Sequence, residues 1–145
     1  VLLECPRAWE RLLPQGIRRA ETAVELGGQD WDLLALTEGG CAAGAERKVQ
    51  CRLLLLPGSW EQPLPPGLTA ETVISYGLSA RDSLTLSSLT EPVLCIQRQL
   101  PRPDGGQVEP QEFLLPVLSG PAEVLLPLLG VRLLQIPLDR DPFAW

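Results

Sequence analysis

The sequence predicts a single α/β domain over residues 1–145. Its mixed sheet is parallel in the N-terminal half and antiparallel in the C-terminal half, and two or three helices flank it. Strand and helix patterns alternate through the first 58 residues, as in a parallel sheet with crossover connections. Consecutive strand patterns then run from residue 71 to residue 117, as in an antiparallel sheet. A chain of 145 residues is long enough to bury more than half of its surface.

The first elements are short. Residues 1–5 predict a strand and residues 8–13 a brief helix, and a proline follows each of them. Residues 17–27 predict a longer helix, because apolar side chains recur at spacings of three and four and glycine follows.

Two longer strands are predicted next, at residues 30–37 and 49–56. The second is a continuous apolar run, which is typical of a strand covered on both faces. Between them, residues 38–48 are rich in Gly and Ala and predict a loop or a short helix. The motif Gly39-Gly40-x-x-x-Gly44 weakly resembles a dinucleotide-binding loop, so it is either an anion cradle or a flexible loop.

The C-terminal half contains further strand patterns. Three prolines make residues 59–68 an irregular connection. Asp104-Gly105-Gly106 predicts the turn of a hairpin with a loop longer than two residues. The predicted strands lie at residues 71–76, 83–89, 93–100 and 108–117.

A last helix is predicted after residue 119. Pro121 suits a first-turn position, and Gly130 predicts the end of the helix. Its buried face is expected to consist of Val124, Leu125, Leu128 and Leu129. Residues 131–136 then predict a final strand, and residues 139–145 a tail.

Charge and composition exclude several classes of partner. The net charge is −6 and Lys48 is the single lysine, which argues against nucleic acid and against an anionic membrane surface. No apolar run approaches the length of a membrane span. The four cysteines form no CxxC pair and no histidine is present, so we expect reduced thiols, a cytoplasmic location, no metal and no cofactor. The lack of histidine also excludes a Ser-His-Asp triad or a Cys-His pair.

The turn from Tyr76 to Asp82 is the first candidate binding site. Gly77 permits an unusual backbone angle, Arg81 offers a guanidinium to a carboxylate or phosphate, and Tyr76 offers a rigid donor. The alternative is an ordinary β-turn, in which Asp82 or Ser79 caps backbone groups and Arg81 pairs with an acid.

A row of hydroxyl side chains is the second candidate. The row is expected to build either a polar groove for a sugar or a peptide edge, or the solvated face of an antiparallel sheet. It consists of Ser83, Thr85, Ser87 and Ser88, beside Gln97 and Arg98 of the next strand.

The segment ISYGLSARDSLTLSSL, followed by CIQRQL and EPQEF, resembles a small uncharacterised protein family of Gram-positive, clostridia-like bacteria. That resemblance covers about two thirds of the chain and implies no activity. SYGLS alone is similar to a strand and turn of Mur-type peptide ligases, whose ATP-binding loop is missing here. The positions that carry the family pattern are Ser75, Tyr76, Gly77, Arg81, Asp82, Ser87, Ser88, Gln97, Arg98, Gln111 and Glu112.

Two functions remain open from the sequence. The first is a non-catalytic binding or self-assembly module, because no complete catalytic set is present and apolar edge strands can pair with another copy. The alternative is a small enzyme or ligand-binding domain that acts on a sugar- or nucleotide-like molecule through the Tyr76–Asp82 turn. The predicted partners are therefore a second copy of the chain and a small polar ligand. The residues expected to bind that ligand are Tyr76, Arg81, Asp82, Ser87, Ser88 and Arg98.

Arg98 is also predicted to support the fold. It falls on the same alternation as the apolar side chains of its strand, so it is expected to turn inward and to pair with Asp82 or Glu112. Arg98→Ala is then expected to lower stability by a few kcal/mol. Arg81, in the exposed turn, is expected to matter little for stability.

Overall fold

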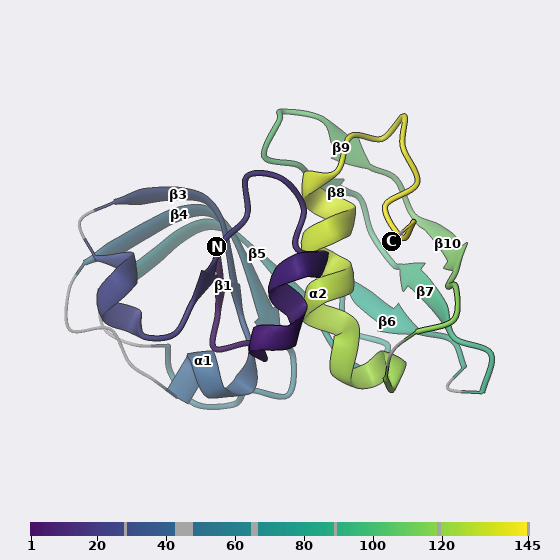
Figure 1. Cartoon of the computed structure of the whole chain (residues 1–145), viewed down its shortest axis with the longest axis horizontal. Coiled ribbons are helices and arrows are strands. Elements are labelled where there is room, and N and C mark those ends of the chain that lie inside the picture. Colours follow the sequence, from purple (N-terminus) through teal and green to yellow (C-terminus); the bar gives the residue numbers. More distant parts are fainter. Residues whose placement is uncertain (28, 43–47, 65–66, 89, 119, 145) are drawn as a thin grey trace.

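An eight-stranded mixed sheet organises the computed structural model, which describes residues 1–27, 29–42, 48–64, 67–88, 90–118 and 120–144 (Figure 1). Its strand order is β10-β7-β6-β5-β4-β3-β1-β2. The strands are β1 (Leu2–Leu3), β2 (Arg19–Ala20), β3 (Asp30–Leu36), β4 (Val49–Pro57), β5 (Leu68–Tyr76), β6 (Leu84–Leu86), β7 (Val93–Ile96) and β10 (Gln111–Leu114).

The remaining elements connect or cover this sheet. A separate antiparallel pair is formed by β8 (Leu100–Pro101) and β9 (Gln107–Val108). The helices are η1 (Arg7–Leu12) and η2 (Ala23–Leu26), which are 3-10 helices, and α1 (Glu38–Ala42) and α2 (Ala122–Gln135), which are α-helices. Helix α2 lies across the sheet, and η1 lies beside it (Figure 1). No helix in the described ranges is long and apolar enough to cross a membrane.

The predicted fold class is confirmed. From β2 through β1, β3, β4 and β5 to β6, neighbouring strands are parallel. The pairs β6–β7 and β7–β10 are antiparallel. The central pair is the longest, with β4 aligned to β5 from Val49↔Leu68 to Pro57↔Tyr76. In β4, the consecutive residues Leu53, Leu54 and Leu55 are all buried, so this part of the strand is covered on both faces, whereas Gln50 and Arg52 are exposed.

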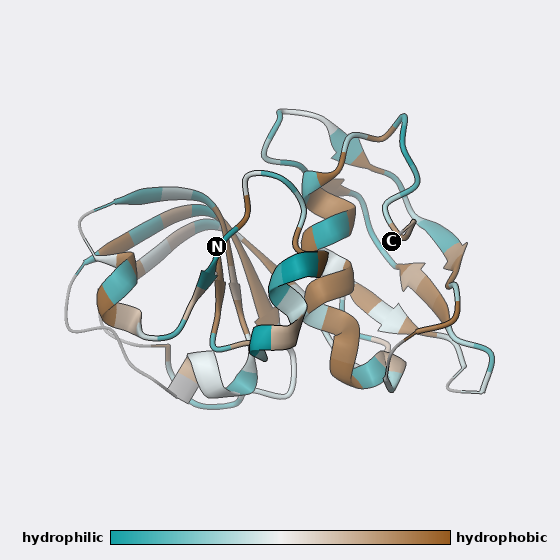
Figure 2. Ribbon diagram, viewed as in Figure 1, coloured by the Kyte–Doolittle hydropathy of each residue, from teal (hydrophilic) through white to brown (hydrophobic). Residues whose placement is uncertain are grey.

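Two apolar clusters cover the two faces of the sheet. The larger one joins α2 to side chains such as Leu33, Leu55 and Ile74. The other includes Leu34 and Leu54, their chain neighbours, which point the opposite way. Figure 2 shows that α2, which lies against the sheet, is largely hydrophobic. Successive residues of one strand therefore contribute to both clusters.

The helix predicted at residues 17–27 is wrong. Arg19 and Ala20 form β2, a short edge strand parallel to β1, and η2 follows. The Leu2 and Glu4 amides donate to the carbonyls of residues 18 and 20, so pairing with β1 replaces helical hydrogen bonds. Val24, a member of the expected apolar stripe, is exposed. A short stripe is weak evidence for a helix when a neighbouring strand offers hydrogen bonds.

The predicted end of the last helix is also wrong. Helix α2 runs through Gly130 to Gln135, so residues 131–135 of the expected strand are helical and Ile136 is the helix C-cap. Gly130 faces the sheet, where an added Cβ would lie 2.7 Å from Leu55 Cδ2 and 3.0 Å from Leu84 Cδ1. Glycine is used here for close helix–sheet packing, not to end the helix. Val124, expected in the buried face, is exposed.

The predicted hairpin is confirmed, with changed strand limits. The turn around Gly105, which has a φ of 87°, joins β8 to β9. The strand predicted at residues 93–100 is divided into β7 and β8, and the strand predicted at residues 108–117 is divided into β9 and β10. Because β10 returns to pair with β7, the hairpin projects from the main sheet.

Candidate functional site

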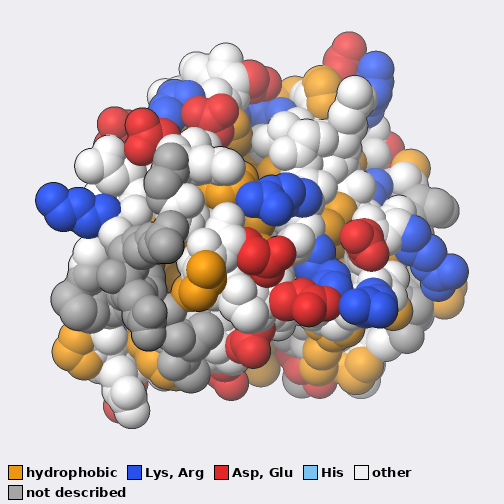
Figure 3. Space-filling model, turned by 60° about the vertical axis from the view of Figure 1, so that its left-hand side comes forward, with side chains coloured by type: hydrophobic (Ala, Val, Ile, Leu, Met, Phe, Trp, Pro, Cys, Tyr) orange, Lys and Arg blue, Asp and Glu red, His pale blue; other side chains and the backbone are white. Residues whose placement is uncertain are grey.

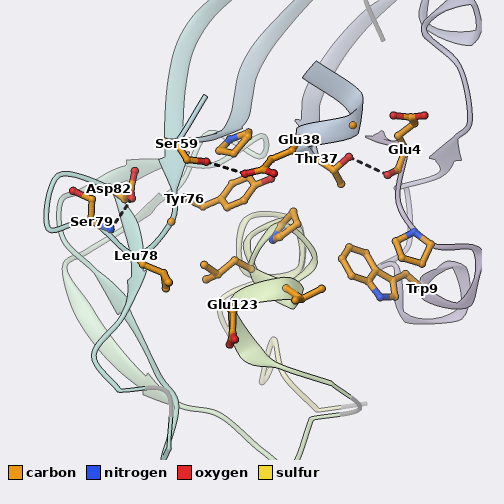
Figure 4. Close-up of a pocket in the computed structure, with 18 residues that line it drawn as sticks. Glu4, Trp9, Thr37, Glu38, Ser59, Tyr76, Leu78, Ser79, Asp82 and Glu123 are labelled. Carbon is orange, nitrogen blue, oxygen red and sulfur yellow. Dashed lines mark hydrogen bonds between the residues drawn. The ribbon is translucent and has the colours of Figure 1, made fainter. Parts of the chain in front are cut away.

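A pocket of about 760 Å³ lies where four parallel strands end. Its rim is formed by the residue that follows each strand: Glu4 after β1, Thr37 after β3, Gly58 after β4 and Gly77 after β5. Helices η1 and α2 contribute the opposite wall (Figure 4). The carboxyl edge of a parallel sheet is the usual position of ligand sites in open α/β folds.

The wall opposite the sheet is apolar. Trp9 of η1 and Leu126 and Pro127 of α2 are buried side chains that line the pocket. Leu78 and Val124 are exposed and line it as well. The pocket therefore combines a polar rim with an apolar wall, which suits a small organic molecule.

Tyr76 stands between the rim and the apolar wall (Figure 4). Its hydroxyl donates a 2.7 Å hydrogen bond to the Leu36 carbonyl, and the pair is buried. Burial raises the pKa of the Tyr76 phenol far above its usual value near 10. The phenol stays protonated at neutral pH, and its hydrogen bond joins the ends of β5 and β3.

Asp82 is the most buried carboxylate of the pocket, with 5% of its surface exposed. Its Oδ2 accepts a 3.1 Å hydrogen bond from the Ser79 amide. The carboxylate lies directly against Gly58 and Gly77, where a Cβ at either position would overlap it. These two glycines therefore make room for Asp82 at the sheet edge. The unusual backbone angle expected at Gly77 is absent, because its φ lies outside the positive range.

The other end of the rim carries Glu4 and Glu38. Glu4 has a positive φ of 55°, which is uncommon for a residue with a side chain. The Thr37 hydroxyl donates to the Glu4 carbonyl at 2.9 Å and accepts from the Gly40 amide at 3.1 Å. The exposed Glu38 carboxylate accepts a 2.9 Å hydrogen bond from the Ser59 hydroxyl.

The position of Glu4 bears on the predicted anion cradle. Its carboxylate lies beside Gly39 in the first turn of α1, and a Cβ on Gly39 would lie 2.5 Å from Glu4 Oε2. A carboxylate of the protein thus occupies the space that an anion would need. Gly44, the third glycine of the motif, lies outside the described residues. The geometry around Gly39 does not favour anion binding.

The charge of the pocket is negative. Four carboxylates line it, from Glu4, Glu38, Asp82 and Glu123, and none of its described lining residues is Lys or Arg. Glu123 lies on the α2 side, away from Glu38 (Figure 4). Such a lining repels phosphates and carboxylates, attracts positively charged groups and admits neutral ones.

Two of the six predicted ligand-binding residues line this pocket, Tyr76 and Asp82. Arg81, Ser87, Ser88 and Arg98 do not line it. Ser88 accepts hydrogen bonds from the amides of residues 90 and 91, which makes it a turn cap. Whether any of the six binds a ligand stays a prediction.

The hydroxyl row is not continuous. Ser83 and Thr85 are buried, because β6 lies inside the sheet between β5 and β7. Ser87 is exposed. The four hydroxyl side chains therefore form neither a continuous polar groove nor a continuous solvated face.

The prediction for Arg98 is wrong. Strand β7 ends at Ile96, so the alternation that would turn Arg98 inward stops before it. Arg98 is exposed and donates to the Arg81 carbonyl at 3.0 Å, without an ion pair in the described part of the chain. The buried guanidinium of this region belongs to Arg102, which contacts the end of α2.

Sequence reasoning missed most of the pocket. Thr37, Gly58 and Gly77 each follow a strand, and three of the four parallel strand ends were predicted within one residue. The rule that ligands bind beyond these ends could have located the rim. No local signal marks Trp9 or Leu126, because only packing of η1 and α2 brings them to the pocket.

The cysteines and acidic residues do not form a metal centre within the described ranges. All four cysteines are free; Cys95 is half-buried and the other three are buried. Burial raises the pKa of the Cys41 and Cys51 thiols to about 11. These thiols are protonated at neutral pH and behave as small apolar side chains.

Comparisons with protein-family models, with curated proteins and with solved structures find no match to this chain.

Proposed function

We propose that the protein is a non-catalytic binding module that holds a small organic molecule at the carboxyl edge of its parallel strands. The observation that carries this proposal is the pocket of about 760 Å³ outside β1, β3, β4 and β5. Its volume lies within the usual range of small-molecule sites, and its polar rim and apolar wall match their usual lining.

A binding role fits the state of the polar groups better than a catalytic one. Catalytic acids and bases are expected to change protonation near the working pH. The Tyr76 phenol is held protonated by burial and already donates to the Leu36 carbonyl. Asp82 is held by the Ser79 amide and by two glycines at the sheet edge.

The alternative remains a small enzyme or ligand-binding domain that acts on a sugar- or nucleotide-like molecule. The carboxylates of Glu38 and Asp82 are suitable acceptors for sugar hydroxyls. The nucleotide branch has less support, because the described lining offers no cationic side chain to a phosphate. The Tyr76–Asp82 turn contributes to the pocket in either case.

A fluorine NMR screen of fluorinated fragments tests the binding proposal. We expect hits on the parent protein that disappear in Val124→Trp, where a large ring is added to the pocket wall. Val24→Trp is the matched control, because Val24 is similarly exposed, at 63% against 56%, and lies in η2 outside the pocket. The proposal is wrong if no fragment binds, or if every hit binds both variants equally.

Self-assembly is the second candidate, favoured by apolar exposure beside a sheet edge. Strand β10 is the last strand of the sheet, and Leu114 at its end is 85% exposed. Val117, three residues further, is 97% exposed. Free strand edges with apolar side chains can pair with another copy of the chain. Light scattering should then show that the parent protein is a dimer. Val117→Asp should dissociate the dimer, and the control Val24→Asp should leave it intact. A monomeric parent protein would rule out self-assembly.

We also place the protein in the cytoplasm and expect neither nucleic acid nor a membrane as partner. Free cysteines support a reducing compartment. On the face drawn in Figure 3, Lys and Arg side chains are interspersed with Asp and Glu. Such a mixed surface lacks the clustered positive charge that nucleic acid and anionic lipids require.

A further inference from the structure

We infer that the ligand of this pocket carries an organic cation, an ammonium or a guanidinium, and that Asp82 binds it. The inference rests on the proposed function, namely that the pocket holds a small molecule. It adds the chemical class of the ligand and the residue that selects it.

The first observation is that Asp82 is buried without a positively charged partner. Only 5% of its surface is exposed, and the ion pairs of the described residues all involve other carboxylates. The Ser79 amide donates to Oδ2, while Oδ1 accepts no hydrogen bond from the described residues. Oδ1 is not a fully buried atom, so it can accept from a ligand, and a cation there would offset the desolvation of this largely buried carboxylate.

The second observation is that the surrounding backbone holds the carboxylate in place. The Gly77 amide donates to the Leu84 carbonyl, and the Asp82 amide donates to the Ser79 carbonyl at 3.0 Å. Gly58 and Gly77 allow the carboxylate to lie against the ends of β4 and β5. An acceptor that is already ordered loses little conformational freedom on binding, which favours affinity.

The third observation is the chemistry of the rest of the pocket. Three further carboxylates line the pocket, and Trp9 and Leu126 supply an apolar surface for an organic body. The described acidic and cysteine side chains form no group of three that could hold a metal ion. An organic cation with an apolar body is therefore complementary to both the charge and the wall of the pocket.

Three probes of similar size test this inference, because they differ mainly in the charge of the head group. They are 2-phenylethylammonium, 2-phenylethanol and 3-phenylpropionate. Titrations followed by amide NMR signals should show the ammonium binding at least about tenfold more tightly than the alcohol, in line with a charge-assisted hydrogen bond. The carboxylate should bind most weakly. The ammonium should shift the amides of Gly58, Gly77 and Ser79, which surround the Asp82 carboxylate.

Asp82→Asn provides the matched variant, since its amide oxygen can still accept from Ser79. It should abolish the preference for the ammonium and leave the affinity for the alcohol unchanged. Asp139→Asn, an exposed position outside the pocket, should retain the preference. If Asp82→Asn does not fold, the preference of the parent protein and its amide shifts still decide the question.

The outcomes separate this inference from the proposed function. If the alcohol binds as tightly as the ammonium, or the carboxylate binds best, the pocket binds small molecules but the inferred charge is wrong. If none of the three probes binds, the inference is also wrong, and the fragment screen alone decides whether the pocket is a binding site. Retention of the ammonium preference in a folded Asp82→Asn protein overturns the role assigned to Asp82.

Discussion

Arg102→Met should lower the free energy of unfolding by about 3 kcal/mol, because Arg102 binds the last turn of α2. The Arg102 side chain is almost fully buried, with 2% of the residue exposed. Its Nη1 donates to the Leu133 carbonyl and its Nη2 to the Ile136 carbonyl, both at 2.6 Å. These carbonyls belong to the helix end, where carbonyl groups have no partner within the helix.

The magnitude follows from these contacts. Two hydrogen bonds from a charged donor contribute about 1.5 to 3 kcal/mol each. Met fills much of the same space and avoids the desolvation of a buried charge, which offsets about 1 to 2 kcal/mol. The ion pair of Arg102 with Asp104, at 3.3 Å, adds little to stability, because the Asp104 side chain is largely exposed. The net loss is therefore about 3 kcal/mol.

Urea unfolding, followed by circular dichroism and by tryptophan fluorescence, measures this change. With an m-value of about 2 kcal/mol per molar urea, the midpoint should fall by about 1.5 M. Arg98→Met is the matched control: Arg98 is exposed with a single hydrogen bond to the Arg81 carbonyl, so its stability should change by less than about 0.5 kcal/mol.

Two results would refute this reasoning. One is an Arg102→Met protein that unfolds at the urea midpoint of the parent. The other is an Arg98→Met protein that loses as much stability as Arg102→Met, which would favour the original prediction of a buried Arg98.

Three further predictions follow from single side chains. Gly130→Ala should destabilise the protein by about 1 kcal/mol in urea, because crowding against two buried leucines outweighs the helix propensity of Ala; Gly120→Ala, with open space around it, should be neutral. Tyr76→Phe should lower stability by about 1 to 2 kcal/mol in thermal unfolding, since a buried carbonyl at the end of β3 loses its donor; an unchanged melting curve would contradict this. Because burial raises the pKa of Cys51 to about 11, this thiol should resist iodoacetamide at pH 8 while the half-buried Cys95 reacts, as mass spectrometry of the native protein can show.

Part of the site was predictable from local chemistry. Tyr76 and Asp82 were identified because a turn with glycine, aromatic and acidic residues follows a β-branched strand. The hydroxyl row and the strand beside it predict Ser87 and Arg98 as well, yet these two residues lie outside the pocket. Local patterns show which side chains have suitable chemistry. They do not show which of these side chains face the same space.

The wrong helix predictions have a similar cause. Residues 17–27 have an apolar spacing that suits a helix, but β1 offers a strand partner for Arg19 and Ala20. Gly130 suits a helix end, but a glycine is required there by the nearby sheet. In both cases a neighbour distant in sequence decided the outcome, because tertiary contacts contribute more free energy than the local preference of a few residues.

The amino-acid sequence by itself determined the class of the fold, because strand and helix patterns alternate in its first part and an apolar run such as Leu53–Leu56 in β4 must be covered on both faces. It also determined the hairpin at Gly105 and the acidic turn at Asp82, because turn chemistry acts over a few residues. Only the tertiary structure decided that four strand ends, η1 and α2 enclose one pocket, and that Asp82 is buried there without an ion pair to any described residue. Those features depend on distances between segments far apart in the chain, and such distances are set by packing of the whole core.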